Sequence, residues 1–192
     1  MNRLESKLGR LTFKNPITVA SGTFSHEYNK LYDISQLGAI VTKTITPEPK
    51  QGNPVPRLYE TECGLLNSIG LQNPGIDSFI DSYVREYKSF DTPLLVSFSA
   101  GTIDEFCEML KQLEEVETIS GYEVNVSCPN VENEGLAFGV DAKIVNQLTS
   151  RLSALTQKEL IIKLSPNVTD IVSIAKAAED GGATSIALIN TL

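Results

Sequence analysis

The chain has 192 residues, of which 41% are hydrophobic and 21% are charged, and its formal net charge at pH 7 is −8. It contains no apolar run of about 18 residues or more, which argues against a membrane span, and its acidic balance argues against a sequence-independent grip on nucleic acid. Three cysteines without CxxC spacing exclude a disulfide framework and a four-cysteine zinc site, and with no apolar signal segment they predict a cytoplasmic location.

The first residues, "LESKLGRLTFKN" (4–15), predict a small antiparallel hairpin that turns near Gly9. Short apolar segments rich in Val and Ile then recur along the chain, as expected for strands that are buried on both faces. These segments are residues 17–21, 39–45, 93–99, 122–127, 159–165 and 184–190.

Helical periodicity lies between several of these segments. Residues 73–90, 102–115 and 169–182 each place apolar side chains on one helical face. Thr102 and Glu105 stand at the spacing of a capping box, and the last segment ends in a Gly pair, a common helix stop. Strands that alternate with helices predict right-handed crossovers and a parallel sheet.

An open doubly wound sheet and a (β/α)8 barrel both fit this alternation. Polar residues stand at the carboxyl ends of the predicted strands, and in a barrel these ends converge on one mouth, where active sites are found. No GxGxxG follows the first strand, so we favour the barrel, here with only six βα units and the hairpin. The strand-end residues are Lys43, Thr44, Ser97, Ser99, Asn125, Ser127, Lys163, Ser165, Asn190 and Thr191.

The residue types at these strand ends indicate which ligands the barrel mouth could bind. Lys43 and Lys163 suggest an electron-rich ligand such as a phosphate, a carboxylate or a reduced flavin, although a strand-end lysine is as often a solvated charge. Cys128 can act as a base or nucleophile, although a lone cysteine is more often a buried filler. Four asparagines suit a planar heterocycle that bears amides: Asn67, Asn125, Asn130 and Asn190.

Four other residues receive a structural interpretation. Asn73 and Asn133 lie next to Pro or Gly and are predicted to form turns. Cys107 lies beside the apolar stripe of its helix and is predicted to be core. His26 follows the first predicted strand and is expected to be exposed.

Six segments carry a resemblance to a known family: "NPITVASGTF", "GAIVTKTITPEPKQGNPVPRLYET", "GLLNSIGLQNPG", "NVSCPNV", "IIKLSPNVTDI" and "ALINTL". Together and in this order they resemble the catalytic subunit of the class 1 dihydroorotate dehydrogenases, and the 1B branch more than the 1A branch. The resemblance implies an FMN enzyme on a TIM (β/α)8 barrel that oxidises dihydroorotate to orotate in pyrimidine (UMP) synthesis. Residues 1–192 are then a single, incomplete barrel domain.

The resemblance also implies roles for individual residues. Cys128 is the base that takes a proton from C5 of dihydroorotate while a hydride leaves C6 for the flavin. Lys43 touches flavin and substrate, and Lys163 stabilises the anionic reduced flavin. The implied FMN contacts are Ser21, Lys43, Thr44, Asn125, Lys163 and Ile189. The implied substrate contacts are Lys43, Asn67, Ser68, Ile69, Gly70, Leu71, Asn125, Asn130, Asn190 and Thr191.

One departure from the family concerns the flavin. Phe98 stands where 1B relatives often have an asparagine for FMN, and we expect Ser97 or Ser99 to replace that contact. The family further implies an electron-transfer subunit with FAD and an iron-sulfur cluster, in a heterotetramer, or else a homodimer. Three scattered cysteines cannot supply the four thiolates of a cluster, and no metal site is expected in this chain.

A complete barrel needs about 250 residues and eight strands. We therefore expect this chain to be part of a longer polypeptide whose six strands leave unpaired edges and an apolar interior open to water. Two rival functions stay open. One is a barrel lyase or aldolase that forms a Schiff base on Lys43 or Lys163, and the other is a non-catalytic binding or scaffold protein.

Overall fold

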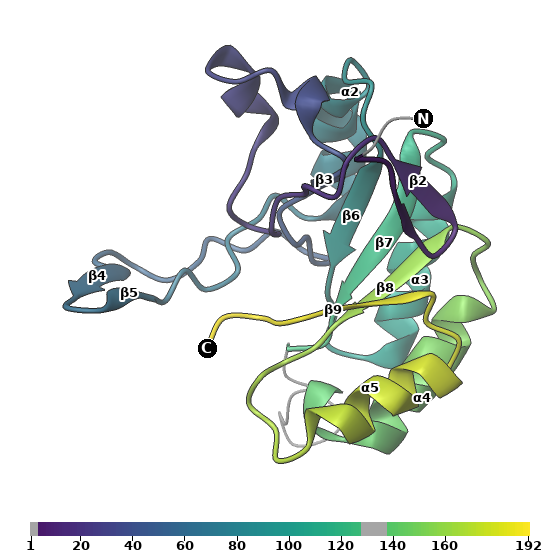
Figure 1. Ribbon diagram of the computed structural model, residues 1–192. Coiled ribbons are helices and arrows are strands. Elements are labelled where there is room, and N and C mark those ends of the chain that lie inside the picture. Colours follow the sequence, from purple (N-terminus) through teal and green to yellow (C-terminus); the bar gives the residue numbers. More distant parts are fainter. Residues whose placement is uncertain (1–3, 128–137) are drawn as a thin grey trace.

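The computed structural model describes residues 4–127 and 138–192. Its centre is a parallel sheet of five strands in the order β3-β6-β7-β8-β9 (Figure 1). Within this sheet each strand lies beside the one that follows it in chain order, and the sheet curls as part of a (β/α)8 barrel, which confirms the predicted fold class. The bounds are Ile40–Val41 for β3, Leu94–Phe98 for β6, Ile119–Asn125 for β7, Glu159–Lys163 for β8 and Ser185–Ala187 for β9.

The first predicted strand, residues 17–21, is wrong as a strand. Only one parallel bridge forms there, between Thr18 and Ala39. The segment is short because Asn15 Oδ1 takes the Ile17 N–H at 3.0 Å, while Gly22 turns the chain at φ +84° soon afterwards. The bridge and the five strands together occupy the six strand positions expected from the sequence.

The strand predicted at 39–45 is interrupted after Val41. The Ser97 N–H donates to the side chain of Thr42, at 3.1 Å, instead of to a backbone carbonyl. Pairing resumes at Ile45, which bridges to Phe98. A side-chain hydrogen bond thus replaces one step of the backbone ladder, as Thr side chains can do.

The helices confirm the predicted caps. Helix α3 (Ile103–Glu114) begins at Thr102, with both hydrogen bonds of the capping box to Glu105. Helix α5 (Ile171–Asp180) ends at Gly181. The predicted helix 73–90 is α1 (Ile76–Ser78), the π-helical η3 (Phe79–Tyr83) and α2 (Val84–Tyr87) in succession. The sequence analysis did not single out α4 (Ala142–Ser153) or the short η1 (His26–Lys30), η2 (Ile34–Gln36) and η5 (Phe138–Val140).

None of the helices in the described parts of the chain is both long enough and apolar enough to cross a membrane.

The two faces of the sheet differ in character. Helices α3, α4 and α5 cover the outer face (Figure 1), where Phe98, Tyr122 and Ile162 join a large apolar core with the helix residues. Because strand side chains alternate, the inner face carries Leu95 and Ile161 in a second, smaller cluster. The same face carries buried polar residues: Ser97, Glu123, Asn125, Glu159 and Lys163. The inner face is therefore partly apolar and partly polar, so the expectation of an apolar interior holds only for the smaller cluster.

The predicted N-terminal hairpin is confirmed as β1 (Ser6–Leu8) and β2 (Leu11–Phe13). It packs on the inner face near the amino ends of the strands, where Phe13 joins the smaller cluster. The Arg10 N–H donates to Glu159 Oε2 at 2.7 Å. Gly9, at φ +50°, allows the close approach, because a Cβ there would overlap the Glu159 carboxylate. This end of the inner face is thus covered.

The edge beside β9 is open in the described residues, as expected. Strand β9 pairs only with β8 there. A hollow of about 410 Å³ lies next to it, lined by apolar side chains that include Ile171, Ala175 and Ile186.

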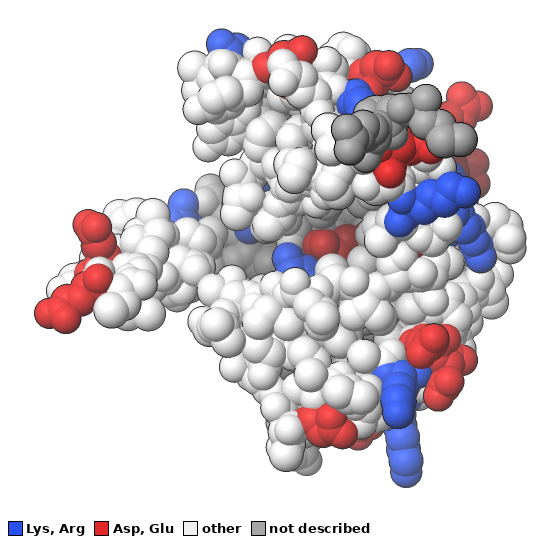
Figure 2. All heavy atoms as spheres, viewed as in Figure 1, with Lys and Arg blue, Asp and Glu red and all other residues white. Residues whose placement is uncertain are grey.

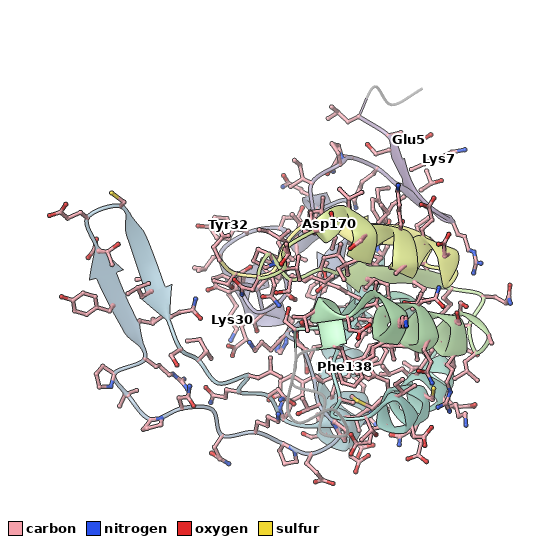
Figure 3. All side chains as sticks on the ribbon, turned by 90° about the horizontal axis from the view of Figure 1, so that it is seen from below. Glu5, Lys7, Lys30, Tyr32, Phe138 and Asp170 are labelled. Atoms are coloured by element: carbon pink, nitrogen blue, oxygen red, sulfur yellow. The ribbon has the colours of Figure 1, made fainter. Side chains whose placement is uncertain are left out.

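A second hairpin was not predicted. Strands β4 (Leu58–Thr61) and β5 (Gly64–Asn67) pair only with each other and project away from the body of the molecule (Figures 1 and 3). Every residue in both strands is exposed. The hairpin therefore does not contribute to the core, and it extends the segment between β3 and α1.

Candidate functional site

Lys163 ends β8 and is the centre of the candidate site. Its Nζ donates to Ser21 Oγ at 2.9 Å and lies 3.8 Å from Glu123 Oε1. The side chains of Lys163 and Glu123 are only 10% and 7% exposed. Ser21 follows the Thr18 bridge, so the curl of the sheet brings together residues that lie 142 positions apart.

Lys43 lies at the same end of the sheet. Burial lowers the pKa of Lys43 from its usual 10.5, and the positive charges of Lys163 and Arg57 lower it further. Gly22 makes room for this side chain, because a Cβ at Gly22 would lie 3.0 Å from Lys43 Nζ. The two predicted lysines are thus close enough to affect one another, and the site is positively charged where they meet.

A network of amides joins two further strand ends. Asn190 Nδ2 donates to Asn125 Oδ1 at 3.1 Å and to Ser127 Oγ at 2.8 Å. The Ser127 N–H in turn donates to Asn125 Oδ1 at 3.1 Å. The Asn190 N–H bonds Leu164 O at 2.9 Å, which places the segment after β9 beside the end of β8. Asn125, Asn190 and Lys163 are therefore brought together.

Three further strand-end hydroxyls form hydrogen bonds within the protein. Thr44 Oγ1 and Ser97 Oγ share a hydrogen bond of 2.9 Å, and Ser99 Oγ donates to Asn125 O at 2.8 Å. Phe98 is fully buried on the outer face, with its ring centroid 5.8 Å from that of Phe106. Phe98 therefore cannot reach the mouth, whereas Ser97 lies on the inner face.

Two predicted residues follow β9 directly. Ile189 is 38% exposed, and Thr191 donates its N–H to Asn190 Oδ1 at 2.8 Å. Both therefore lie on the segment that Asn190 fastens to the mouth.

The loop 67–71 is held from one side by a neighbouring segment. Asn53 Nδ2 donates to both Ser68 O and Ser68 Oγ at 2.9 Å, and the Asn53 N–H donates to Ile69 O at 3.0 Å. Gly70 and Leu71 both have positive φ, 74° and 54°. In the described residues, none of the five loop residues, Asn67, Ser68, Ile69, Gly70 and Leu71, forms a hydrogen bond to another predicted site residue.

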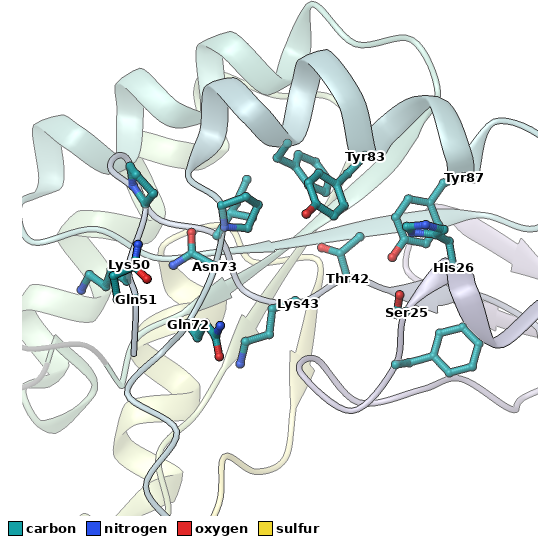
Figure 4. A pocket seen from close by; sticks show the side chains of 15 residues that line it. Ser25, His26, Thr42, Lys43, Lys50, Gln51, Gln72, Asn73, Tyr83 and Tyr87 are labelled. Carbon is teal, nitrogen blue, oxygen red and sulfur yellow. The ribbon is translucent and has the colours of Figure 1, made fainter. Parts of the chain in front are cut away.

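A cavity of about 410 Å³ adjoins Lys43 (Figure 4). Thr42 and Gln72 lie on its wall beside the lysine, and Tyr83 and Tyr87 come from η3 and α2. His26 also lines it and is half-buried, with no hydrogen-bond partner for Nδ1 in the described residues. The expectation of an exposed His26 is wrong, because the rings of Tyr83 and Tyr87 pack against the imidazole edge-on.

Other predictions have mixed outcomes. Asn73 is confirmed as structural: it is buried, its Nδ2 donates to Leu71 O and Thr46 Oγ1, and its Oδ1 accepts from Thr46 and Gly75. Cys107 is confirmed as core. Cys128, Asn130 and Asn133 lie outside the described residues.

The sequence analysis missed Glu123. It stands two residues before Asn125 on β7, and period-two alternation would have placed both on one face. Among the described residues, no cluster of His, Cys, Asp or Glu is suited to hold a metal ion.

This fold and this site define a class of protein: a partial (β/α)8 barrel with a positively charged, amide-lined mouth at the carboxyl ends of its strands. A family model described as dihydroorotate dehydrogenase matches residues 3–192. The chain belongs to the dihydroorotate dehydrogenase family.

Several curated relatives share one printed name, dihydroorotate dehydrogenase B (NAD(+)), catalytic subunit. The one from Thermoanaerobacter pseudethanolicus is 49% identical over 191 residues, which are 98% of this chain and 63% of the relative. The one from Desulforamulus reducens is 47% identical over 191 residues, with the same coverage. The one from Listeria welshimeri is 44% identical over 194 residues, 100% of this chain and 64% of the relative. The chain thus spans just under two thirds of their length.

Proposed function

We propose that residues 1–192 form one incomplete barrel domain of a dihydroorotate dehydrogenase, which oxidises dihydroorotate to orotate with FMN in pyrimidine synthesis. One observation carries this proposal: Lys43, Lys163, Asn125 and Asn190 gather at one mouth. The names of the relatives support it.

The donors at the mouth fit the ring system of FMN. An ammonium has three donors, and Lys163 uses one of them on Ser21, so it can donate to a ring acceptor as well. Glu123 Oε1 is buried and has no hydrogen-bond partner in the described residues, so it can accept from a ligand N–H or hydroxyl. When bound, FMN would supply the acceptor for the substrate hydride. The residues proposed to hold it are Ser21, Lys43, Thr44, Asn125, Lys163 and Ile189.

The substrate would be held by amides and oriented for proton transfer. Asparagine can donate to one ring atom of orotate and accept from another, and Asn190 is already fixed by its bonds to Asn125 and Ser127. Cys128 would take the C5 proton. The other proposed substrate contacts are Lys43, Asn67, Ser68, Ile69, Gly70, Leu71, Asn125, Asn130 and Thr191.

The proposal includes a partner. The relatives are named as catalytic subunits of an NAD(+) enzyme, which supports a second subunit with FAD and an iron-sulfur cluster that passes electrons onward, in a heterotetramer. A homodimer is the alternative assembly. We also propose a cytoplasmic location, which the free thiols of Cys63 and Cys107 support.

The test is the visible absorbance of the purified chain with and without added FMN, followed by anaerobic addition of dihydroorotate. Bound flavin that bleaches would support the proposal, and a chain that binds no FMN would contradict it for these 192 residues. Cys128→Ser should keep FMN and orotate bound but slow flavin reduction by orders of magnitude, because serine is a far weaker base. Reduction at the wild-type rate would remove Cys128 from this role.

One observation favours a second candidate function. A lysine with a lowered pKa, such as Lys43, is what a Schiff-base lyase or aldolase needs. This candidate would be favoured if borohydride trapped a carbonyl compound on Lys43 and the chain did not bind FMN. Family membership supports the dehydrogenase instead.

A further inference from the structure

A buried carboxylate lies among the cations of the mouth. Glu123 is 5% exposed, and its Oε1 lies 3.8 Å from Lys163 Nζ. In the described residues this oxygen accepts no hydrogen bond. A buried charge is costly unless it is paired, so the nearby ammonium is the partner that makes the carboxylate tolerable.

The two lysines need this carboxylate in turn. Lys163 already acts on Lys43 through its positive charge, so two cations are held near one another in a partly buried place. Figure 2 shows basic and acidic side chains in the hollow at the centre of one face. With Glu123 present, the formal charges of Lys43, Lys163 and Glu123 sum to one positive charge instead of two.

We propose that Glu123 is a positioning residue: its carboxylate holds the Lys163 ammonium in reach of Ser21, and it limits the positive charge that a ligand meets at the mouth. The effect on a bound flavin rests on the proposed function, whereas the effect on Lys163 does not.

Two consequences follow when Glu123 becomes a neutral amide. Lys163 loses the carboxylate that holds it in place, so its amine becomes more accessible to an acylating reagent. The mouth also loses one negative charge, so a bound flavin meets one more net positive charge. A more positive surrounding favours the anionic reduced flavin over the oxidised one.

The chain offers a matched control. Glu159 is also a buried carboxylate on the inner face, fully buried at the amino end of β8. It bonds the Arg10 N–H and Ser185 Oγ, away from the mouth. Glu159→Gln therefore reports the general effect of removing an inward carboxylate, and Glu123→Asp reports the effect of keeping the charge.

The first experiment needs no ligand. The 192-residue chain is treated briefly with acetic anhydride at pH 7, and the acetylation rate at Lys163 is measured by peptide mass spectrometry relative to exposed Lys111. In Glu123→Gln this ratio should rise about tenfold, the equivalent of ~1.4 kcal/mol. Glu123→Asp should resemble the wild type, and Glu159→Gln should leave the ratio unchanged. An unchanged ratio in Glu123→Gln, or an equal rise in Glu159→Gln, would overturn the proposal.

The second experiment measures the midpoint potential of bound FMN at pH 7. Glu123→Gln should favour the reduced form by about tenfold, or ~30 mV for a two-electron couple, with no such shift in Glu159→Gln. An unchanged potential would overturn the charge-limiting role. If the wild-type chain binds no FMN, the proposed function fails, and the acetylation ratio alone still decides the role of Glu123.

Discussion

Asn190 donates a hydrogen bond from its Nδ2 to Asn125 Oδ1 over 3.1 Å, and so joins the segment after β9 to the end of β7 across 65 positions of sequence. The same amide group reaches Ser127 Oγ at 2.8 Å. Two parts of the mouth are therefore held in one geometry by a single side chain.

Asn190→Ala should weaken orotate binding by about tenfold or more, or ~1.4 kcal/mol, because it removes a proposed ligand contact and releases Asn125. Isothermal titration with orotate measures this. Asn146→Ala is the control, since Asn146 Nδ2 bonds Ala177 O at 3.1 Å and links two helices outside the mouth. Each variant should cost about 1 kcal/mol of unfolding free energy, but only Asn190→Ala should lose affinity. Equal orotate affinity in both variants would contradict the role of Asn190.

Lys43→Met should change how stability depends on pH. The folded chain holds the Lys43 proton less tightly than the unfolded chain, because burial and Lys163 lower its pKa below 10.5. Between the lowered pKa and 10.5 the unfolded chain binds more protons, so the free energy of unfolding rises with pH in that window. Lys43→Met should remove this rise, raise the melting temperature at pH 7 and weaken orotate binding.

Thermal unfolding at several pH values between neutral and 10.5 checks the prediction for Lys43. The same change at exposed Lys111 is the control and should keep the rise. If the stability of Lys43→Met depended on pH as that of the wild type does, the lowered pKa of Lys43 would not be the cause of the rise.

Glu159→Ala should loosen the N-terminal hairpin. It leaves the Arg10 N–H without its acceptor in a partly buried place and removes the bond to Ser185, which should cost about 2 kcal/mol or more of unfolding free energy. Urea unfolding measures the change. Asp104→Ala is the comparison, because its ion pair with Arg151 is on the surface, with the Asp104 side chain 76% exposed, and should be worth less than about 1 kcal/mol. A smaller loss at Glu159 than at Asp104 would contradict this account.

Gly70→Ala should disturb the loop 67–71. Gly70 has φ +74°, and a Cβ there would lie 2.6 Å from the backbone N of Asn53, so the residue meets both backbone strain and a clash. We expect Gly70→Ala to lower the free energy of unfolding by roughly 1–2 kcal/mol and to weaken orotate binding. Gly64→Ala, in the hairpin that precedes this loop, is the control, because a Cβ there meets no atom within 4 Å. Orotate titrations of both variants provide the test, and a Gly70→Ala chain that binds as the wild type does would remove the loop from the site.

Local signals explain which elements were predictable. The Thr102 capping box and the strands β6, β7 and β8 could be predicted from the sequence, because caps and continuous apolar runs are properties of neighbouring residues. The hairpin β4–β5 was missed since its strands are wholly exposed and carry no apolar alternation. The strand predicted at 17–21 was reduced to one bridge because side-chain hydrogen bonds and a glycine turn outweighed its β propensity.

The sequence by itself determined the family and the residue types of the mouth, because ordered motifs such as "NVSCPNV" and "IIKLSPNVTDI" specify both. Only the tertiary structure decided which of these residues meet. The contact of Lys163 with Ser21 spans 142 positions, and the pairing of Lys163 with Glu123 depends on two neighbouring strands turning the same face inward. The physical reason is that sheet curvature and register are set by packing across the whole chain, so distances at the mouth are not encoded in any local segment.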